Sequence, residues 1–332
     1  MGAAREATGD HSGSLVYRVA AAATLLAVLG TLLVVASLVP AQPLALLEHF
    51  RLQLLCGSAA VTAAAALLRL GGWADVAAMN TLLALVLVAP GLGGERNPGP
   101  ADGVRVRVLL SNVLTSNRDV SRLARLIADT RPDVIALVEP NRTWFAQLAP
   151  TLKEFPGRVE IHDEANFGIA LYARGQVRGG GELLGSAQPT IVATVVLADS
   201  QAAPLTFVIT HPIPPVSTHA AQIHARHLAA VARRVAARSA QGEPVILAGD
   251  FNTTPWSRSF ATLVQATGLV DTRRGLGAQP TFPAFPWWTA LVRIPIDHVL
   301  VSPSIGVVER RVERPIGSDH LPVFAELVVP RR

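Results

Sequence analysis

The amino-terminal part of the chain is dominated by long apolar segments that polar residues interrupt only briefly. Residues 19–39 are uncharged, and a helix over them would cross the roughly 30 Å hydrocarbon core of a bilayer. Residues 53–68 and 76–92 form two further apolar segments, each near the lower length limit for a span. Residues 1–92 are therefore predicted to be a membrane region with about three transmembrane helices, although the second segment also fits a buried or interfacial helix.

Arginines beside these segments predict how the chain crosses the membrane. An odd number of spans places the two termini on opposite sides. Arg5, Arg18 and Arg69 would then face the cytoplasm. Arg51 and Arg96 would lie on the other side, so the positive-inside bias is slight. We expect a multi-pass protein of the cell membrane whose carboxyl-terminal domain is extracytoplasmic.

Beyond residue 92 the hydrophobic pattern changes to that of a folded domain. Residues 93–102 are rich in glycine and proline and are predicted to be a linker. In the region that follows, helical periodicity is found over residues 119–130 and 218–238. Apolar runs of strand length lie at residues 104–110, 133–138, 167–173, 190–197, 205–210, 244–248, 294–301 and 321–329. Because several strands follow one another between helices, residues 103–332 are predicted to form an α/β sandwich with mixed sheets.

Composition narrows the function only a little. The formal net charge of +5 lies entirely in residues 101–332, which hold 24 basic and 19 acidic residues. This excess suits anionic substrates such as phosphates or anionic headgroups, but it is also an ordinary solubility device and lacks the dense basic stripe of a dedicated nucleic-acid binder. The single cysteine, Cys56, lies in the second apolar segment, so the domain tolerates an oxidising compartment without disulfides.

Polar side chains follow several of the predicted strands. Glu139 comes directly after an apolar run, and Asn112 and Asp250 each follow such a run after one small residue. A carboxylate at the end of a buried strand is costly unless it coordinates something, and carboxylate and amide oxygens are the ligands that Mg²⁺ prefers. Glu139 and Asn112 are therefore predicted metal ligands. An acid at a helix start and a turn-forming asparagine remain the alternatives.

Asp250 and Asn252 are the candidates for activating water. The two residues are two apart, so in an extended chain both side chains would face the same side and share one reactant. Asp250 would orient and deprotonate the attacking water, and Asn252 would hold the water or a phosphoryl oxygen. The alternative is an Asx-turn, which the sequence Asp-Phe-Asn-Thr can make unaided.

A second group of polar residues lies near the end of the chain. Asp297 follows an apolar segment, and Asp319 and His320 are neighbours. Asp297 would orient the His320 imidazole and favour its protonated form, as a buried carboxylate does in a catalytic triad. His320 would then stabilise the pentacoordinate phosphorus, while Asp319 would help to bind the metal ion.

Six short motifs lie along the predicted domain, and they begin at Ser111, Val138, Thr210, Gly249, Ile296 and Ser318. Together they resemble the endonuclease/exonuclease/phosphatase superfamily over about residues 103–329, in the order of that family. The resemblance implies a four-layer sandwich of two mixed β-sheets flanked by helices, with Mg²⁺-dependent (sometimes Mn²⁺-dependent) attack of water on a phosphoester. It also assigns His211 to contact with the phosphate. Leu114 occupies a place where DNA-repair members carry a further carboxylate.

The amino-terminal segments also resemble those of a membrane-anchored bacterial branch that includes VanJ-type teicoplanin-resistance proteins. Residues 281–288 form a proline-broken aromatic stretch that either rims the site at the membrane interface or caps the sandwich core. Four further histidines are interpreted as structural or surface residues: His219, His224, His227 and His298.

These features predict a membrane-anchored hydrolase that needs Mg²⁺ or Mn²⁺ and cleaves a phosphomonoester, phosphodiester or pyrophosphate. A membrane anchor favours a lipid-linked substrate. One alternative is an extracytoplasmic nuclease. The other is a non-catalytic module that binds a phosphorylated cell-wall precursor, and a water-activating group would serve no purpose in such a module. The expected catalytic residues are His211, Asp250, Asn252, Asp297 and His320, and the expected metal ligands are Asn112, Glu139 and Asp319.

Overall fold

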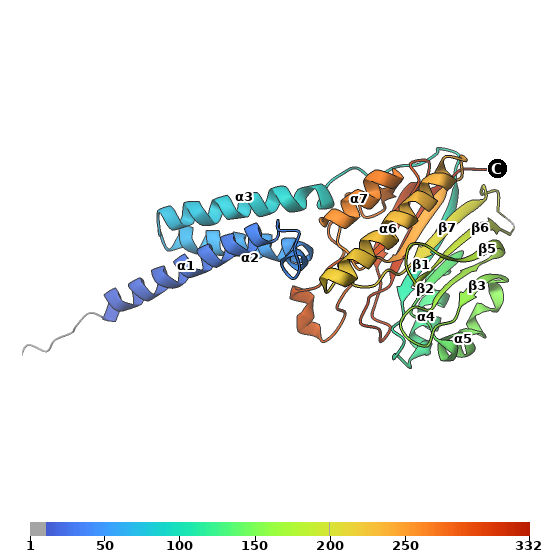
Figure 1. Ribbon diagram of the computed structural model, residues 1–332, viewed down its shortest axis with the longest axis horizontal. Coiled ribbons are helices and arrows are strands. Elements are labelled where there is room, and N and C mark those ends of the chain that lie inside the picture. Colours follow the sequence, from blue (N-terminus) through green and yellow to red (C-terminus); the bar gives the residue numbers. More distant parts are fainter. Residues whose placement is uncertain (1–10, 199) are drawn as a thin grey trace, which may run out of the picture. The chain divides into compact units, whose positions relative to one another are not determined.

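The computed structural model describes residues 11–198 and 200–332, with the backbone alone at residues 11–17 and 20. The chain divides into two compact units, Met1–Ala89 and Pro90–Arg332. Figure 1 shows helices in the first unit and a sandwich of strands and helices in the second.

The described part of the amino-terminal unit consists of four helical elements. They are α1 (His11–Ala36), η1 (Leu44–Phe50), α2 (Arg51–Leu67) and α3 (Gly72–Leu92). Among the described residues, two helical segments have the length and apolar composition to cross a membrane, Leu44–Leu67 and Gly72–Leu92.

The first predicted span, residues 19–39, falls mostly on α1 (His11–Ala36), which ends three residues before the predicted boundary. The part of α1 over Ala21–Ala36 is apolar. The helix ends at Ala36, four residues before Pro40, whose ring would clash with the carbonyl of Ala36 if the helix continued. Two of the three predicted spans thus coincide with described helices that could cross a membrane by length and composition, and the first span stays a prediction.

Hydrogen bonds between side chains join the helices of this unit. The Asn80 amide of α3 donates to Thr31 Oγ1 of α1 at 2.9 Å and to the Ala27 carbonyl at 3.3 Å. The hydroxyls of Thr62 in α2 and Thr81 in α3 form a hydrogen bond with an Oγ1–Oγ1 distance of 2.9 Å. Polar groups on otherwise apolar helices are thus paired with one another inside the bundle.

The carboxyl-terminal unit contains two six-stranded sheets among its described residues. The first has the order β11-β12-β1-β2-β4-β3, and the second β5-β6-β7-β8-β10-β9. The strands of the first sheet are β1 (Val104–Asn112), β2 (Val134–Val138), β3 (Gly157–Ile161), β4 (Ile169–Ala173), β11 (Gly306–Val312) and β12 (Val323–Val329). Those of the second are β5 (Gly175–Leu183), β6 (Pro189–Leu197), β7 (Leu205–Thr210), β8 (Val245–Asp250), β9 (Val270–Asp271) and β10 (Asp297–Val301).

One parallel strand pair in each sheet fixes the position of the site. β1 runs parallel to β2, and β7 runs parallel to β8, while the other pairs of described strands are antiparallel. Parallel strands end at the same edge of a sheet. Helices make the two crossovers, α4 (Val120–Thr130) and α6 (Thr218–Ser239). Antiparallel β10 begins where β8 ends, because Asp297 pairs with Asp250.

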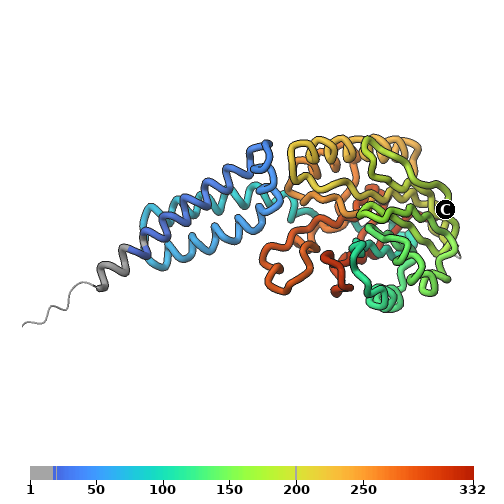
Figure 2. The backbone as a smooth tube through the Cα atoms, turned by 60° about the horizontal axis from the view of Figure 1, so that its bottom comes forward, coloured from blue at the N-terminus to red at the C-terminus, as the bar shows by residue number. Residues whose placement is uncertain are grey.

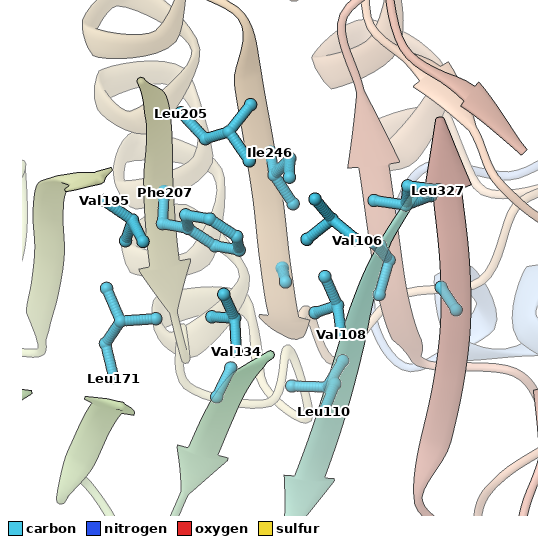
Figure 3. Close-up of a cluster of buried hydrophobic side chains, with 14 of the residues drawn as sticks. Val106, Val108, Leu110, Val134, Leu171, Val195, Leu205, Phe207, Ile246 and Leu327 are labelled. Carbon is cyan, nitrogen blue, oxygen red and sulfur yellow. The ribbon is translucent and has the colours of Figure 1, made fainter. Parts of the chain in front are cut away.

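The main core fills the space between the two sheets. Val108 and Leu110 of the first sheet point toward Phe207 and Ile246 of the second (Figure 3), and all four are fully buried. These strands are apolar on both faces, because helices cover the outer face of each sheet.

Helices form the two outer layers. In Figure 2, α6 lies along one side of the unit, and α4 with α5 (Arg142–Leu148) along the other. The helix α7 (Arg258–Thr267) packs beside α6 on the second sheet. The predicted four-layer arrangement of two mixed sheets between helices is confirmed.

The strand pattern also shows where the sequence interpretation was incomplete. It did not predict β3, β5, β9 or β11, nor the helices α5 and α7. The strand β5 contains three consecutive glycines and alternates exposed with partly buried residues, so it lacks the apolar run that marks a buried strand. The remaining short elements are η2 (Thr151–Glu154) and η3 (Trp287–Leu291).

Candidate active site

Six buried polar residues meet where the two parallel strand pairs end. Each lies at a strand end or directly after one, or in the loop before β12. Gly249 lets the chain pass close to β7 at this edge, since its φ is +152° and a Cβ atom would lie 1.9 Å from the Thr210 carbonyl oxygen. The six residues are Asn112, Glu139, His211, Asp250, Asp297 and His320.

Glu139 is held in an uncommon backbone conformation. Its φ is +62°, which is costly for a residue with a side chain and is found mainly where structure serves function. The Glu139 N–H donates to the Gly168 carbonyl at 2.8 Å, and its own carbonyl accepts a bond from Thr115 at 3.0 Å. These bonds direct the carboxylate into the site.

The Glu139 carboxylate is only partly satisfied. Its Oε1 accepts a hydrogen bond of 2.9 Å from the Asn112 amide, whereas Oε2 is buried and has no partner among the described residues. Burial raises the pKa of Glu139, and the hydrogen bond from Asn112 offsets only part of that effect. A buried carboxylate oxygen without a partner is the feature expected of a metal ligand.

Asn112 lies between the two carboxylates of the site. Its amide nitrogen donates to Glu139 at 2.9 Å and to Asp250 Oδ2 at 3.2 Å. Its oxygen accepts a bond from the Leu114 N–H at 3.1 Å. In this orientation Asn112 bridges the carboxylates, and its predicted role as an oxygen ligand to the metal stays a prediction.

The premise that Asp250 and Asn252 lie on one extended strand is wrong. β8 ends at Asp250, and Asn252 has a φ of +50°. Asp250 Oδ1 accepts the Asn252 N–H at 2.9 Å, which is the Asx-turn that the sequence allowed as an alternative. The Asn252 amide donates to the Pro212 carbonyl at 3.0 Å and so joins this turn to the loop after β7. The predicted contact of Asn252 with water or phosphate stays a prediction.

A chain of buried ionisable groups runs through Asp297, His320 and Asp250. His320 Nδ1 lies 2.8 Å from Asp297 Oδ2, and His320 Nε2 lies 3.5 Å from Asp250 Oδ2. Burial alone would lower the pKa of His320, but the charges of Asp297 and Asp250 outweigh it and raise the pKa to about 10. His320 is therefore a cation at neutral pH, oriented by Asp297.

The two carboxylates of this chain respond in opposite directions. Burial would raise the pKa of Asp297, but the adjacent His320 cation and its hydrogen bond lower it. Burial raises the pKa of Asp250, and the positive charge of His320 offsets only part of that effect. Asp297 is thus a stable counter-ion, while Asp250 is poised to take up a proton.

His211 faces both carboxylates from the end of β7. Its Nε2 lies 3.6 Å from Asp250 Oδ2 and 3.8 Å from Glu139 Oε1. Burial, followed by the positive charge of His320, lowers the pKa of His211 to about 3. The imidazole is therefore neutral, and it packs against the Phe167 ring.

The described residues fit a hard divalent cation. Two groups of three residues each present ligand atoms that lie within 4.8 Å of one another. The first group is Glu139, His211 and Asp250, and the second is Asp250, Asp297 and His320. The second group already holds its own cation, because His320 is protonated and bonded to Asp297. The first group has two carboxylates and a neutral imidazole, so it lacks a compensating cation and is the better candidate.

Asp319 belongs to neither of these groups of described residues. It is half-buried beside His320, and its backbone carbonyl accepts the Ala284 N–H at 2.7 Å. Ligation of a metal ion by Asp319 stays a prediction.

Two buried histidines that the sequence interpretation did not place at the site support the turn after Asp250. His224 of α6 donates to the Phe251 carbonyl at 2.9 Å, and His298 of β10 donates to the Thr253 carbonyl at 2.8 Å. His298 follows Asp297, and the alternation of a strand predicted that its side chain would point to the opposite face. No local sequence signal marks the His224 contact, which joins residues 27 positions apart.

The sequence profile of the Endonuclease/Exonuclease/phosphatase family matches residues 109–320, a range that contains every residue of the candidate site. The chain therefore belongs to this family. No curated protein matches it.

Solved structures of the same fold cover about two thirds of the chain. An endonuclease/exonuclease/phosphatase from Beutenbergia cavernae is 24% identical, with a TM-score of 0.53 and coverage of 68% of this chain and 72% of that one. D. rerio TDP2 complexed with single strand DNA product is 17% identical, with a TM-score of 0.54 and coverage of 67% and 98%. A mannosyl-6-phosphatase from Bacteroides thetaiotaomicron is 18% identical, with a TM-score of 0.51 and coverage of 67% and 99%.

Proposed function

We propose that this protein is a membrane-anchored phosphoesterase that uses a divalent metal ion to hydrolyse a phosphoester or pyrophosphate. The observation that carries the proposal is the pairing of two features at one buried edge. A carboxylate–imidazolium–carboxylate chain joins Asp297, His320 and Asp250, and beside it lies the unpartnered carboxylate oxygen of Glu139.

Asp250 is the proposed general base. Its carboxylate is anchored by the Asn252 N–H and the Asn112 amide, so it has a fixed direction. Burial raises its pKa above the ordinary range of an aspartate, toward the range in which a base accepts a proton at neutral pH. A water that approaches the phosphorus from this side would lose its proton to Asp250.

His320 is the proposed electrostatic stabiliser. Attack of water on a phosphoester increases the negative charge on the phosphoryl oxygens, and a fixed cation in a buried site stabilises that charge. Asp297 keeps His320 both protonated and oriented. The neutral His211 offers a hydrogen bond to the same phosphate, as the family resemblance implies.

The metal ion would be held by Glu139, with Asn112, Asp319 and His211 as further candidates, and Asp250 would face the ion as the base. A bound divalent cation supplies Lewis acidity and makes water more acidic. Because the donors are mainly oxygens, Mg²⁺ or Mn²⁺ fits better than Zn²⁺.

Anchoring supports a lipid-linked substrate. The described part of the chain carries two helical segments that are long and apolar enough to span a membrane. A domain tethered to a bilayer meets lipid headgroups at high effective concentration. The fold alone does not choose the substrate, since one similar structure is named a phosphatase for a sugar phosphate and another holds DNA. We propose that the carboxyl-terminal domain is extracytoplasmic. The protein would belong to a branch of the family that resembles VanJ-type resistance proteins.

A substrate panel tests the proposed chemistry. The full-length chain in detergent micelles would be assayed on lipid phosphates, lipid-linked pyrophosphates, small phosphodiesters and single-stranded DNA, with Mg²⁺ or with EDTA. We expect metal-dependent release of phosphate from a lipid substrate. Hydrolysis that survives EDTA unchanged would overturn the metal dependence, and a preference for DNA would replace the lipid substrate by a nuclease function.

A reporter fused after Arg332 tests the proposed location. A reporter that functions only outside the cytoplasm should be active. Activity of a cytoplasm-specific reporter in the same position would reverse the proposed topology.

A further inference from the structure

The described surface of the carboxyl-terminal unit carries one concentrated apolar segment, residues 285–292, which we name the apolar rim. Elsewhere among the described residues of this unit, the large hydrophobic side chains with comparable exposure are Leu183 and Val216. The rim carries the others within eight positions: Phe285 (50% exposed), Trp287 (86%), Trp288 (57%), Leu291 (83%) and Val292 (44%). Such a concentration on one segment is typical of a binding surface.

The apolar rim is fixed to the candidate active site. The residues just before it are bonded to the loop that carries His320, because the Ala284 N–H donates to the Asp319 carbonyl at 2.7 Å and the Thr281 carbonyl accepts the Leu321 N–H at 2.9 Å. The Phe282 ring lies 4.7 Å from the His320 ring, measured between centroids. Whatever binds the rim is therefore held at a set distance from the catalytic groups.

The polar groups of this loop are largely satisfied within it. Thr289 Oγ1 donates to the Pro286 carbonyl at 2.7 Å, and Arg293 Nε donates to the Pro283 carbonyl at 2.8 Å. Pro283 and Pro286 have no N–H to satisfy. A loop with paired polar groups enters an apolar phase at a low desolvation cost.

We propose that the apolar rim inserts into the interfacial region of a lipid bilayer and so presents a lipid phosphate to the site. Residues 281–292 contain no charged side chain, and Trp287 and Trp288 are the residue type that prefers the headgroup depth. The chain's own apolar helices supply a bilayer as the nearest apolar partner. The inference deepens the proposed function and rests on it for the identity of the site.

Fluorescent labelling tests insertion without using activity. The only native cysteine, Cys56, is replaced by serine, and Leu291→Cys or the matched control Leu183→Cys is labelled with nitrobenzoxadiazole in the full-length chain. Leu183 is 71% exposed and lies on β5, outside the apolar rim. In phospholipid nanodiscs, lipids with a nitroxide on the acyl chain should quench the label at 291 strongly, and aqueous iodide should quench it weakly. The label at 183 should show the reverse.

Equal iodide quenching at both positions would overturn the proposal. The proposal would also be overturned if the label at residue 291 were protected from iodide in detergent solution and the mass of the protein particle doubled. The apolar rim would then join two copies of the chain.

A kinetic ratio tests the consequence for the substrate. In nanodiscs, the rate on a lipid phosphate is divided by the rate on a water-soluble phosphodiester measured in the same sample. The double variant Trp287→Ala with Trp288→Ala should lower this ratio by at least about tenfold, because the interfacial contact is lost. The control Leu183→Ala should leave the ratio unchanged.

The two arms separate the inference from the proposed function. If residue 291 inserts but no phosphoester is hydrolysed, the proposed membrane contact stands and the proposed phosphoesterase activity is wrong. If phosphoesters are hydrolysed, the double tryptophan variant keeps the wild-type rate ratio and residue 291 is exposed to iodide, the proposed activity stands and the proposed membrane contact is wrong.

Discussion

The two sides of the candidate site satisfy their buried charges in different ways. On one side, Asp297 and His320 form a compensated pair with an N–O distance of 2.8 Å. On the other side, Glu139 receives one bond from a neutral amide, and its second oxygen has no partner among the described residues. Asp250 lies between them and contacts both sides. One side therefore carries its own cation, whereas the other side lacks one and suits a metal ion.

Asp250→Asn, the change at the junction of the two sides, should have the largest effect. The amide keeps the size of the side chain but cannot accept a proton, so turnover should fall by at least about a hundredfold. Melting temperature should change little. Steady-state kinetics with Mg²⁺ measures the loss, and Asp129→Asn on the surface of α4 serves as the control. Wild-type turnover in Asp250→Asn would place the base elsewhere.

Asp297→Asn tests the compensated side through the pH dependence of the rate. The Asp297 charge helps to hold the pKa of His320 at about 10, so the imidazole stays cationic through neutral pH. Without that charge the pKa should fall, and activity that needs the cation should be lost at a lower pH than in the wild type. Near neutral pH the rate should drop between about tenfold and a hundredfold. An alkaline limb that does not move would show that His320 does not act as a cation.

Glu139→Gln tests the uncompensated side in the absence of metal, where the expected effect is smallest. Burial raises the pKa of Glu139, so its favourable contribution to stability is present at low pH and is lost as the pH rises through the folded-state pKa. At pH 7 in EDTA, the neutral amide should therefore raise the free energy of unfolding by about 1 kcal/mol. Chemical unfolding measures the change, with Glu164→Gln on the surface as the control. A destabilised variant would mean that the Glu139 charge is already compensated.

The general position of the site was predictable because strand ends are visible in the sequence. Apolar runs end directly before Glu139 and one residue short of Asn112 and Asp250, and parallel neighbours bring such ends to one edge. The pairing of Asp297 with His320 was expected from residue types. The family order of the motifs supported each assignment, although no single motif was specific.

Side-chain direction was less predictable. Whether Asn112 presents its oxygen or its nitrogen depends on the carboxylates around it, and these come from other strands. The left-handed conformation of Asn252 follows from the Asx-turn with Asp250, which competes with extension of the strand. The support of this turn by His224 is a contact between distant positions, and hydrophobic periodicity does not contain it.

Metal binding measured on matched variants tests the central claim most directly. Full-length protein in detergent would be titrated with Mn²⁺, with the free ion followed by electron paramagnetic resonance. We predict that the wild type binds Mn²⁺, that Asp297→Asn retains most of this affinity, and that Glu139→Gln loses it by at least about tenfold, since a ligand has been removed. Unchanged binding by Glu139→Gln, or a larger loss in Asp297→Asn, would contradict the assignment of the metal ion to the Glu139 side.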